Sequence, residues 1–228
     1  MIKFDTVTLS EKNNDLFEIC SWMQNMADNQ QSLRFVNYYM EMPIVSQTSV
    51  VPDRNGTFIA TLPEHHVKVI AKKHKTIITI NPELSLMARC QSINPVSGEV
   101  VLSDFHYIAL HDEQRANARV RLPKPVNVAI ETGGVNMAGM LKNISIGGCH
   151  VNLFLRTLKP GTNVTVALKM FDPATQAILK IPAAAELVRT DATKMPVDCS
   201  FRFKQYSAMD DKLGMFVNKC QRDVLQNI

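Results

Sequence analysis

The 228-residue sequence lacks the patterns that mark membrane and secreted proteins. No run approaches the roughly 18 uncharged apolar residues that a membrane-spanning helix needs. The N-terminal residues lack the basic start and apolar core of a signal peptide. The five cysteines are odd in number, widely spaced and never arranged as Cys-x-x-Cys, which favours reduced thiols over a disulfide framework or a zinc site. We therefore expect a cytoplasmic protein.

Motifs of known catalytic and metal sites are also missing. The sequence contains no Gly-x-Ser-x-Gly elbow, no phosphate-binding P-loop and no paired-carboxylate pattern. His65 and His66 are adjacent, so in a strand they point to opposite faces and cannot easily share a metal ion. No Asp, Glu or Cys completes a spaced set of ligands with the histidines. We expect a binding protein, neither an enzyme nor a metalloprotein, with no cofactor.

Charge is distributed unevenly along the chain. Residues 1–110 contain 9 Lys and Arg against 11 Asp and Glu, whereas residues 111–228 contain 16 against 10. Hydrophobic residues make up 46% of the chain and charged residues 20%, as in an ordinary globular protein of one or two domains. The positive potential of the C-terminal half favours an anionic ligand, although a solvated basic surface would have the same composition.

Residues 11–30 have the periodicity of an amphipathic helix. Apolar side chains recur there at steps of three and four residues, with Trp22 beside them. The recurring positions are Leu16, Ile19, Cys20, Met23 and Met26. Asn13 or Asn14 is suited to cap the first turn, and we expect the two methionines to fill a core.

Residues 32–108 alternate between β-rich segments and turns. The expected strands are residues 33–39, 44–51, 57–62, 76–80, 85–93 and 99–108. The intervening residues 51–56 end in Asn-Gly, and residues 94–98 contain Pro and Gly, so both predict turns. Residues 64–75 fit both a short helix and a strand. One helix followed by about six strands predicts a small barrel or sandwich.

The C-terminal half is again rich in β-forming segments. The expected strands are residues 126–131, 137–143, 150–154, 163–170, 178–189 and 197–203. Short antiparallel strands joined by turns with Gly or Pro favour a barrel that closes its own edges. Residues 207–226 then predict a helix with one apolar face, which either covers a mouth of the barrel or mediates dimerisation.

Two short motifs in the C-terminal half carry the chemistry of an anion site. The first places Arg115 and Arg119 four residues apart, and the second is Asn143-Ile-Ser145-Ile-Gly-Gly148. A guanidinium group is a planar fork that pairs in bidentate fashion with phosphate, or with the O6 and N7 edge of guanine. Asn and Ser supply short donors and acceptors for the rest of a base edge. Together these motifs suit an anionic, guanine-bearing ligand.

Three further residues, Gln114, Arg121 and Gly147, extend the two motifs. The segment around Gln114 has little apolar material to bury, so it suits a loop that orders on contact with a ligand. Arg121 is either a third phosphate contact or a surface residue. Gly147 and Gly148 let the backbone turn tightly and approach a ligand closely. A solvated basic linker, and a turn whose polar side chains bond their own backbone, are the alternatives.

The pair of motifs resembles the PilZ domain, a bacterial receptor for cyclic di-GMP, over about residues 113 to 205. Its signature is RxxxR followed by [D/N]xSxxG, and all five positions match. Either half alone is common in basic loops or in turns, whereas the two in this order are far more specific. Gln114 stands where relatives often have an arginine, which leaves one cationic contact fewer for a second nucleotide. One or two bound ligand molecules therefore both fit the resemblance.

The resemblance implies a role for each matched residue. Arg115 and Arg119 would clasp the phosphates and the Hoogsteen edge of a guanine. Asn143 and Ser145 would bond the base from the surface of the barrel, and Gly148 would keep the turn open. Cyclic di-GMP would then be a ligand and not a cofactor.

The order of elements in the N-terminal half is similar to the N-terminal domain of YcgR-like flagellar brake proteins. A strand that ends near residue 108 leads through a polar segment into RxxxR, as in that family. We predict a mainly β fold with an N-terminal split barrel, a six-stranded PilZ barrel, a short N-terminal helix and a C-terminal helix. The expected domains are residues 1–110 and 123–228, joined by a linker, residues 111–122, that carries RxxxR.

The resemblance predicts a cytosolic bacterial receptor whose two domains change their arrangement when the ligand draws the arginine loop onto the barrel. In this family the output is usually contact with another protein, often a flagellar motor component. We therefore expect control of motility or biofilm formation, recruitment to the flagellar basal body, and a monomer or homodimer without a membrane span. The alternative is a cyclic di-GMP-dependent transcription regulator that binds nucleic acid. A partner-binding adaptor with a vestigial ligand site is a third reading, which the five matched residues oppose.

Overall fold

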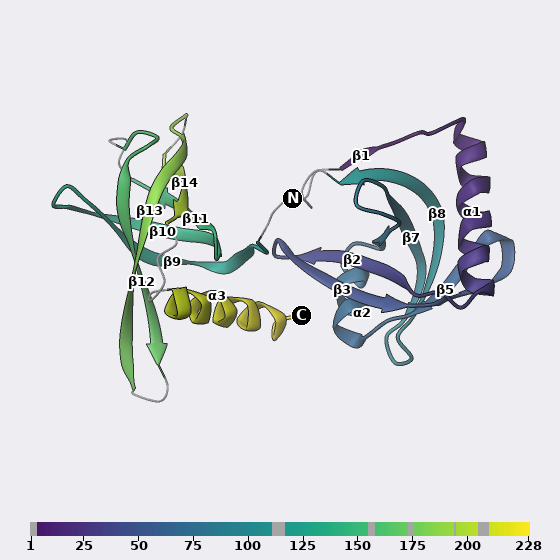
Figure 1. The fold of residues 1–228 in the computed structure, drawn as a ribbon. Coiled ribbons are helices and arrows are strands. Elements are labelled where there is room, and N and C mark those ends of the chain that lie inside the picture. The colour runs from purple at the N-terminus through teal and green to yellow at the C-terminus, as the bar shows by residue number, and fades with distance from the viewer. Residues whose placement is uncertain (1–3, 111–116, 155–157, 173–175, 194, 205–209) are drawn as a thin grey trace. The chain divides into compact units, whose positions relative to one another are not determined.

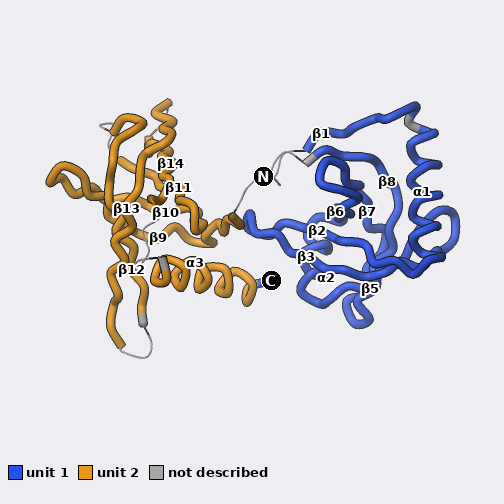
Figure 2. Tube along the Cα trace, in the orientation of Figure 1, with its two compact units in different colours: residues 1–115, 228 blue, residues 116–227 orange. Residues whose placement is uncertain are grey.

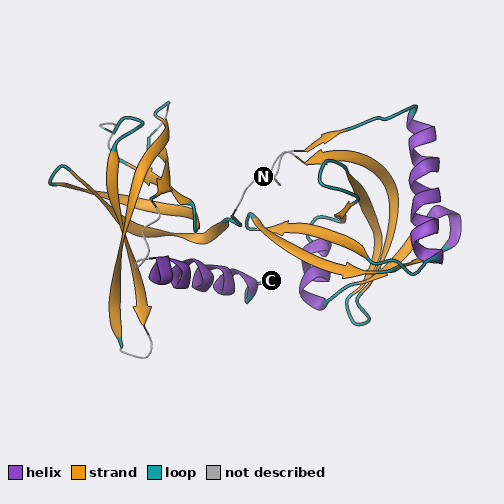
Figure 3. Ribbon diagram, viewed as in Figure 1, coloured by secondary structure: helices purple, strands orange, loops and turns teal. Residues whose placement is uncertain are grey.

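The computed structural model describes residues 4–110, 117–154, 158–172, 176–193, 195–204 and 210–228. Two compact units make up the chain, one of residues 1–115 with residue 228 and one of residues 116–227 (Figure 2). Both units consist mainly of antiparallel strands, with fewer helices (Figure 3). The predicted fold class is confirmed.

The first unit is a curved, open sheet with two helices (Figure 1). Its elements are β1 (Phe4–Thr6), α1 (Lys12–Asp28), β2 (Leu33–Tyr39), β3 (Met42–Thr48), β4 (Val50–Pro52), a 3-10 turn (Arg54–Gly56), β5 (Phe58–Thr61), α2 (Glu64–Ala71), β6 (Lys75–Thr79), β7 (Ser85–Asn94) and β8 (Glu99–Leu110). The strand order is β3-β2-β6-β7-β8-β5-β4, and β1 pairs with β8. This sheet is a half-barrel, as expected for a split barrel.

Helix α1 packs its buried face, which includes Ile19 and Met23, on the core of this sheet. The predicted helix is confirmed, but two details are wrong. Leu16 is 43% exposed and does not belong to the buried face. The N-cap residue is Glu11, because the carboxylate of Asp15 reaches back to accept hydrogen bonds from the backbone of Leu9 and from Ser10.

Two segments of the first unit needed the tertiary structure to be assigned. Residues 64–75, which fitted both a helix and a strand, begin with α2, whose Val67 and Ile70 are buried against the sheet. The prediction of one continuous strand at residues 44–51 is wrong. Two strands, β3 and β4, replace it, and they lie at opposite ends of the strand order. A hydrophobic run does not reveal that the chain changes its pairing partner from β2 to β5, because both β3 and β4 bury apolar side chains.

The second unit is a closed barrel of six antiparallel strands with a C-terminal helix (Figure 1). Its elements are β9 (Val120–Thr132), β10 (Val135–Ser145), β11 (Gly148–Leu153), β12 (Asn163–Asp172), β13 (Ala177–Asp191), β14 (Val197–Phe203) and α3 (Asp210–Leu225). The strands close in the order β10-β11-β14-β13-β12-β9. Gly133 and Gly134 join β9 to β10, and both have positive φ, as a tight hairpin turn requires.

Helix α3 packs on the barrel through contacts with β9 and β13. Its buried face carries Leu213, Phe216, Val217 and Val224. This contact favours the predicted covering role over dimerisation, since the apolar face is already occupied within the unit. Met209, within the helix predicted at residues 207–226, lies outside the described residues. None of the helices in the described part of the chain is long and apolar enough to cross a membrane.

Candidate functional site

The Asn-x-Ser-x-x-Gly motif forms the hairpin between β10 and β11. Ser145 ends β10 and Gly148 begins β11, and the two residues face each other across the strands. The Ser145 hydroxyl donates a hydrogen bond of 3.2 Å to the carbonyl oxygen of Gly148. The predicted turn with its own side-chain-to-backbone bond is therefore present. Asn143 precedes it on β10, opposite His150 on β11.

A β-bulge at Lys142 decides which way the motif faces. Before the bulge, Gly139 and Leu141 point into the barrel, and after it Ile144 does so. Strict alternation from Leu141 would have placed Asn143 and Ser145 in the core. The extra residue shifts the phase, so that Asn143 and Ser145 point to the outer surface of the barrel.

The strand register aligns polar side chains across this outer surface. Asn143 is paired with Arg121 of β9 on one side and with His150 of β11 on the other, and His150 is paired with Ser200 of β14. Directly opposed residues in antiparallel strands project to the same face. The four side chains thus form one row on neighbouring strands. The sequence alone fits Arg121 both as a phosphate contact and as a surface residue, and the strand register sets it in this row.

A second row runs beside the first and contains the motif's other residues. Ser145 is opposite Gly148, and Gly148 is opposite Arg202 of β14. Gly148 is required by its neighbours, since an added Cβ would lie 2.2 Å from the carbonyl oxygen of Phe201. An alanine is therefore excluded there unless the backbone shifts. The close approach of β14 is the steric reason for a glycine at this position, and the role of Gly148 in keeping the turn open for a ligand stays a prediction.

The RxxxR segment lies against this hairpin where the structure describes it. Asn117, between the two arginines, has its amide nitrogen 3.0 Å from the position that a Cβ of Gly147 would take. Arg119 is near enough to Cys149 for its charge to oppose the rise that burial causes in the pKa of that thiol. The two motifs, separated in sequence, are thus brought together. Gln114 and Arg115 lie outside the described residues.

The two polar side chains of the hairpin are largely covered in this structure. Asn143 is 8% exposed and Ser145 is 6% exposed, although both point away from the barrel core. A ligand that bonds these groups must therefore displace what covers them. Arg121 and Arg202, in contrast, are exposed. A ligand can therefore reach the two guanidinium groups directly. The Asn143 amide and the Ser145 hydroxyl, which are suited to bond a base edge, are covered.

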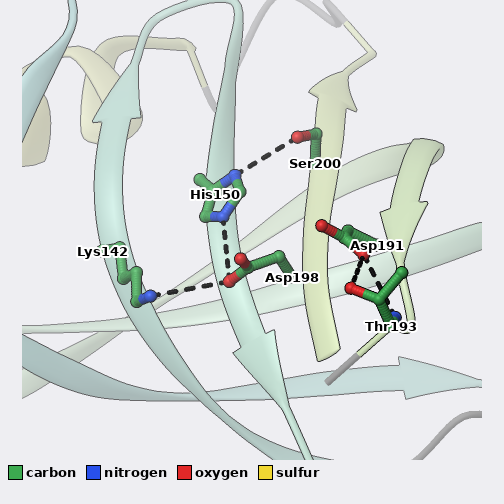
Figure 4. A network of polar contacts seen from close by, with 6 residues as sticks. All are labelled: Lys142, His150, Asp191, Thr193, Asp198 and Ser200. Carbon is green, nitrogen blue, oxygen red and sulfur yellow. Dashed lines mark hydrogen bonds and ion pairs between the residues drawn. The ribbon is translucent and has the colours of Figure 1, made fainter. Parts of the chain in front are cut away.

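A charged network borders the site on β10, β11 and β14 (Figure 4). The Asp198 carboxylate lies 3.5 Å from the Lys142 ammonium and 3.4 Å from His150 Nε2. The other ring nitrogen of His150 is 3.3 Å from the Ser200 hydroxyl. Asp191 accepts separate hydrogen bonds from the backbone and hydroxyl of Thr193. Through Asp198, Lys142 at the bulge is connected to His150 and so to the first row.

Sequence reasoning missed two residues of this surface, His150 and Arg202. His150 was only one of several scattered histidines, and Arg202 is far from both motifs in the sequence. The alternation of β14 places Arg202 outward between the buried Phe201 and Phe203, and this pattern alone could have flagged it. Its position beside Gly148 could not be read from the sequence, because it depends on the pairing of β14 with β11.

Metal and thiol chemistry have no support among the described residues, where no cluster of His, Cys, Asp or Glu is suited to hold a metal ion. The five cysteines are all unpaired thiols. Burial raises the pKa of Cys90 to about 12 and the pKa of Cys199 to about 11. These thiols stay protonated at neutral pH and are not nucleophiles.

Comparison with protein families identifies the barrel. Residues 113–218 match the PilZ domain family. The C-terminal unit is a PilZ domain. The match includes both motifs and extends through most of α3. A comparison with curated proteins gave no significant match.

Several solved structures are similar to the whole chain. The structure of YcgR in complex with c-di-GMP from Escherichia coli covers 96% of this chain and 97% of its own, with 11% identity and a TM-score of 0.39. The structure of the inhibitor of motility MotI/DgrA from Bacillus subtilis covers 86% and 97%, with 12% identity and a TM-score of 0.41. The K. pneumonia MrkH–c-di-GMP complex covers 100% and 98%, with 13% identity and a TM-score of 0.40.

Proposed function

We propose that this chain is a cyclic di-GMP receptor and not an enzyme. The observation that carries the proposal is the joint placement of the two motifs on one outer face of the PilZ domain. The RxxxR segment contacts the β10–β11 hairpin through Asn117, and Asn143 and Ser145 point outward beside it. This arrangement offers cations for phosphates and short polar groups for a guanine edge on neighbouring strands.

The proposed roles follow from the chemistry of each group. Arg115 and Arg119 hold the phosphates and the Hoogsteen edge of one guanine as planar forks. Arg121, exposed and directly opposite Asn143, adds a third positive contact. Asn143 and Ser145 bond the base once the ligand has displaced their cover, and Gly147 and Gly148 provide a surface without side chains. Gln114 supplies a neutral contact at most.

We further propose that ligand binding changes the arrangement of the two units. A doubly charged ligand favours the state in which the RxxxR segment and the barrel contact it together. The output is then contact with another protein, in the manner of a flagellar brake, with control of motility or biofilm formation in the cytoplasm of a bacterium. The linker between the domains in this proposal is shorter than the expected residues 111–122 and ends before Val120, where the barrel strand β9 begins.

A second candidate output is ligand-dependent binding to nucleic acid. The excess of basic residues in residues 111–228 favours it, with 16 Lys and Arg against 10 Asp and Glu. The lack of aromatic residues next to the arginine motif opposes it, since single-stranded nucleic acid is usually held by stacking. A gel-shift titration with DNA in the presence and absence of cyclic di-GMP separates this output from a protein partner.

Calorimetric titration of the full chain with cyclic di-GMP tests the receptor. The titration uses the unaltered protein and Arg119→Ala, with GTP as the control ligand. Removing a charge-assisted fork costs about 2 kcal/mol, or more than about tenfold in affinity. Micromolar or tighter binding that is weakened in the variant and absent for GTP supports the proposal. An absence of binding to the unaltered protein contradicts it.

A further inference from the structure

Arg202 occupies the next strand beyond the hairpin motif on the same outer face. It is exposed, and it lies between the buried aromatic residues Phe201 and Phe203 of β14. The pairing of β11 with β14 sets it directly opposite Gly148. Ser145 faces Gly148 from the other side. Arg202 and Ser145 therefore flank Gly148 in one row, with two strand spacings, or about 10 Å, between their backbones.

The position between these two side chains is bare backbone. Gly148 has no side chain because the carbonyl oxygen of Phe201 occupies the place of its Cβ. Gly147 precedes it in the turn and is partly exposed beside Asn117, whereas Gly148 itself is buried, so a ligand must displace what covers this backbone. A planar base lying over this backbone would meet the Ser145 hydroxyl at one edge and the Arg202 guanidinium at the other. Such an arrangement suits guanine, whose O6 and N7 edge is matched by a guanidinium fork.

The guanidinium of Arg202 is not held by its cross-strand neighbours. Glu186 of β13 is opposite Arg202 in the register. In the described part of the chain no ion pair joins the two, and Arg202 makes no side-chain hydrogen bond there. Asp198, two rows away along β14, is instead paired with Lys142 and His150. Arg202 is thus an accessible cation whose donors are free to bind a ligand.

We propose that Arg202 is a further ligand-binding residue, and that its guanidinium contacts the guanine lying over Gly147 and Gly148. This inference rests on the proposed function, because it assigns a residue to the same ligand site. It adds a contact from β14, outside the two sequence motifs. The site then extends across β9, β10, β11 and β14, with arginines at both ends of the polar surface.

Calorimetry with cyclic di-GMP tests this assignment in the full chain. The variants are Arg202→Ala, Arg202→Gln and Arg202→Lys, beside Arg222→Ala as the matched control. Arg222 is an exposed arginine of α3, away from the β10–β11–β14 face, so its loss removes the same charge elsewhere. Thermal unfolding without ligand shows whether each variant keeps its fold, and Arg202→Gln keeps a polar side chain of intermediate length should Arg202→Ala fold poorly.

We expect Arg202→Ala and Arg202→Gln to bind at least about tenfold more weakly, as for loss of a charged hydrogen-bonding group. Arg202→Lys should recover only part of this loss, because it restores the charge without the fork. Arg222→Ala should bind as the unaltered protein does. Binding of both Arg202→Ala and Arg202→Gln within about twofold of the unaltered protein overturns the inference while the proposed function stands. If the unaltered protein does not bind the ligand, both fail together.

Discussion

Arg121 of β9 and Asn143 of β10 face each other on the outer surface of the barrel, after an irregularity in which residues 122–125 of β9 stand against Lys142 of β10. One of these residues is exposed and charged, and the other is largely covered. A ligand approaching this surface meets the guanidinium before it reaches the amide. Under the proposed function, Arg121 would therefore make the first contact with an anion, and deeper groups would select the base.

Replacing Arg121 by alanine should weaken cyclic di-GMP binding by about threefold to tenfold, less than Arg119→Ala, because an exposed cation is screened by solvent. The weakening should shrink as salt is raised. Calorimetry at low and high ionic strength measures both effects. Lys124→Ala is the control, since Lys124 is an exposed cation of the same strand outside the row. Equal effects of the two variants would reduce Arg121 to a contributor to general surface charge.

Gly148→Ala should destabilise the barrel, because the added Cβ meets the carbonyl oxygen of Phe201 at 2.2 Å and one strand must move. We expect a loss of about 1–3 kcal/mol in the free energy of unfolding, typical of overpacking. Urea unfolding followed by circular dichroism measures it.

Gly214→Ala on α3 is the matched substitution for this experiment. Nothing lies within 4 Å of the added Cβ at Gly214. In a helix this change should instead raise stability by about 0.5–1 kcal/mol, because alanine restricts the unfolded chain more than glycine does. Opposite signs for the two substitutions confirm that the contact with β14 is the cause. A Gly148→Ala protein as stable as the unaltered one would refute it.

The first unit should lose stability in mild acid because of His66. This side chain is fully buried, with Nε2 2.9 Å from Asn37 Oδ1 and Nδ1 2.8 Å from the Ser46 hydroxyl. The amide oxygen only accepts, so Nε2 carries the proton and the neutral ring donates to Asn37. Burial, with a smaller effect of His65, lowers the pKa of His66 from 6.5 to about 4. The folded unit thus resists protonation that the unfolded chain accepts.

The unfolded state binds more protons than the folded state between these two values, so stability falls as pH falls from 6.5 toward about 4. The loss is on the order of 3 kcal/mol, at about 1.4 kcal/mol per pKa unit. Fluorescence of Trp22, the single tryptophan, follows urea unfolding of this unit. His65→Gln should keep most of the pH dependence, since burial is the main cause. A flat stability over this range would contradict the assignment.

Asp198→Asn should strengthen binding of an anionic ligand. This carboxylate neutralises Lys142 and faces His150, both next to Asn143. Removing it leaves the positive charge of Lys142 available to the site, and we expect a gain of about twofold to fivefold at low salt. Glu131→Gln, an exposed acid of β9 outside this network, should change affinity less. Weaker binding by Asp198→Asn would show that the network positions the site and that its charge is secondary.

Much of this protein could be predicted from local sequence. Turn residues such as Gly133 and Gly134 and the alternation of apolar residues marked most strands of both units. The helical periodicity of residues 11–30 and 207–226 identified α1 and α3. These features depend on backbone preferences and on burial of one face, which neighbouring residues already encode. The resemblance of the two motifs to the PilZ signature supplied the candidate ligand and five candidate contacts.

The tertiary structure decided how these parts combine. Period-two alternation from Leu141 predicts that Asn143 and Ser145 face the core, and only pairing with β11 accommodates the extra residue that turns them outward. The requirement for Gly148 arises from β14, and so does the presence of Arg202 beside it. These relationships join strands that are distant in sequence. The sequence determined which chemical groups the site contains, and the register of the closed barrel decided which of them share a surface.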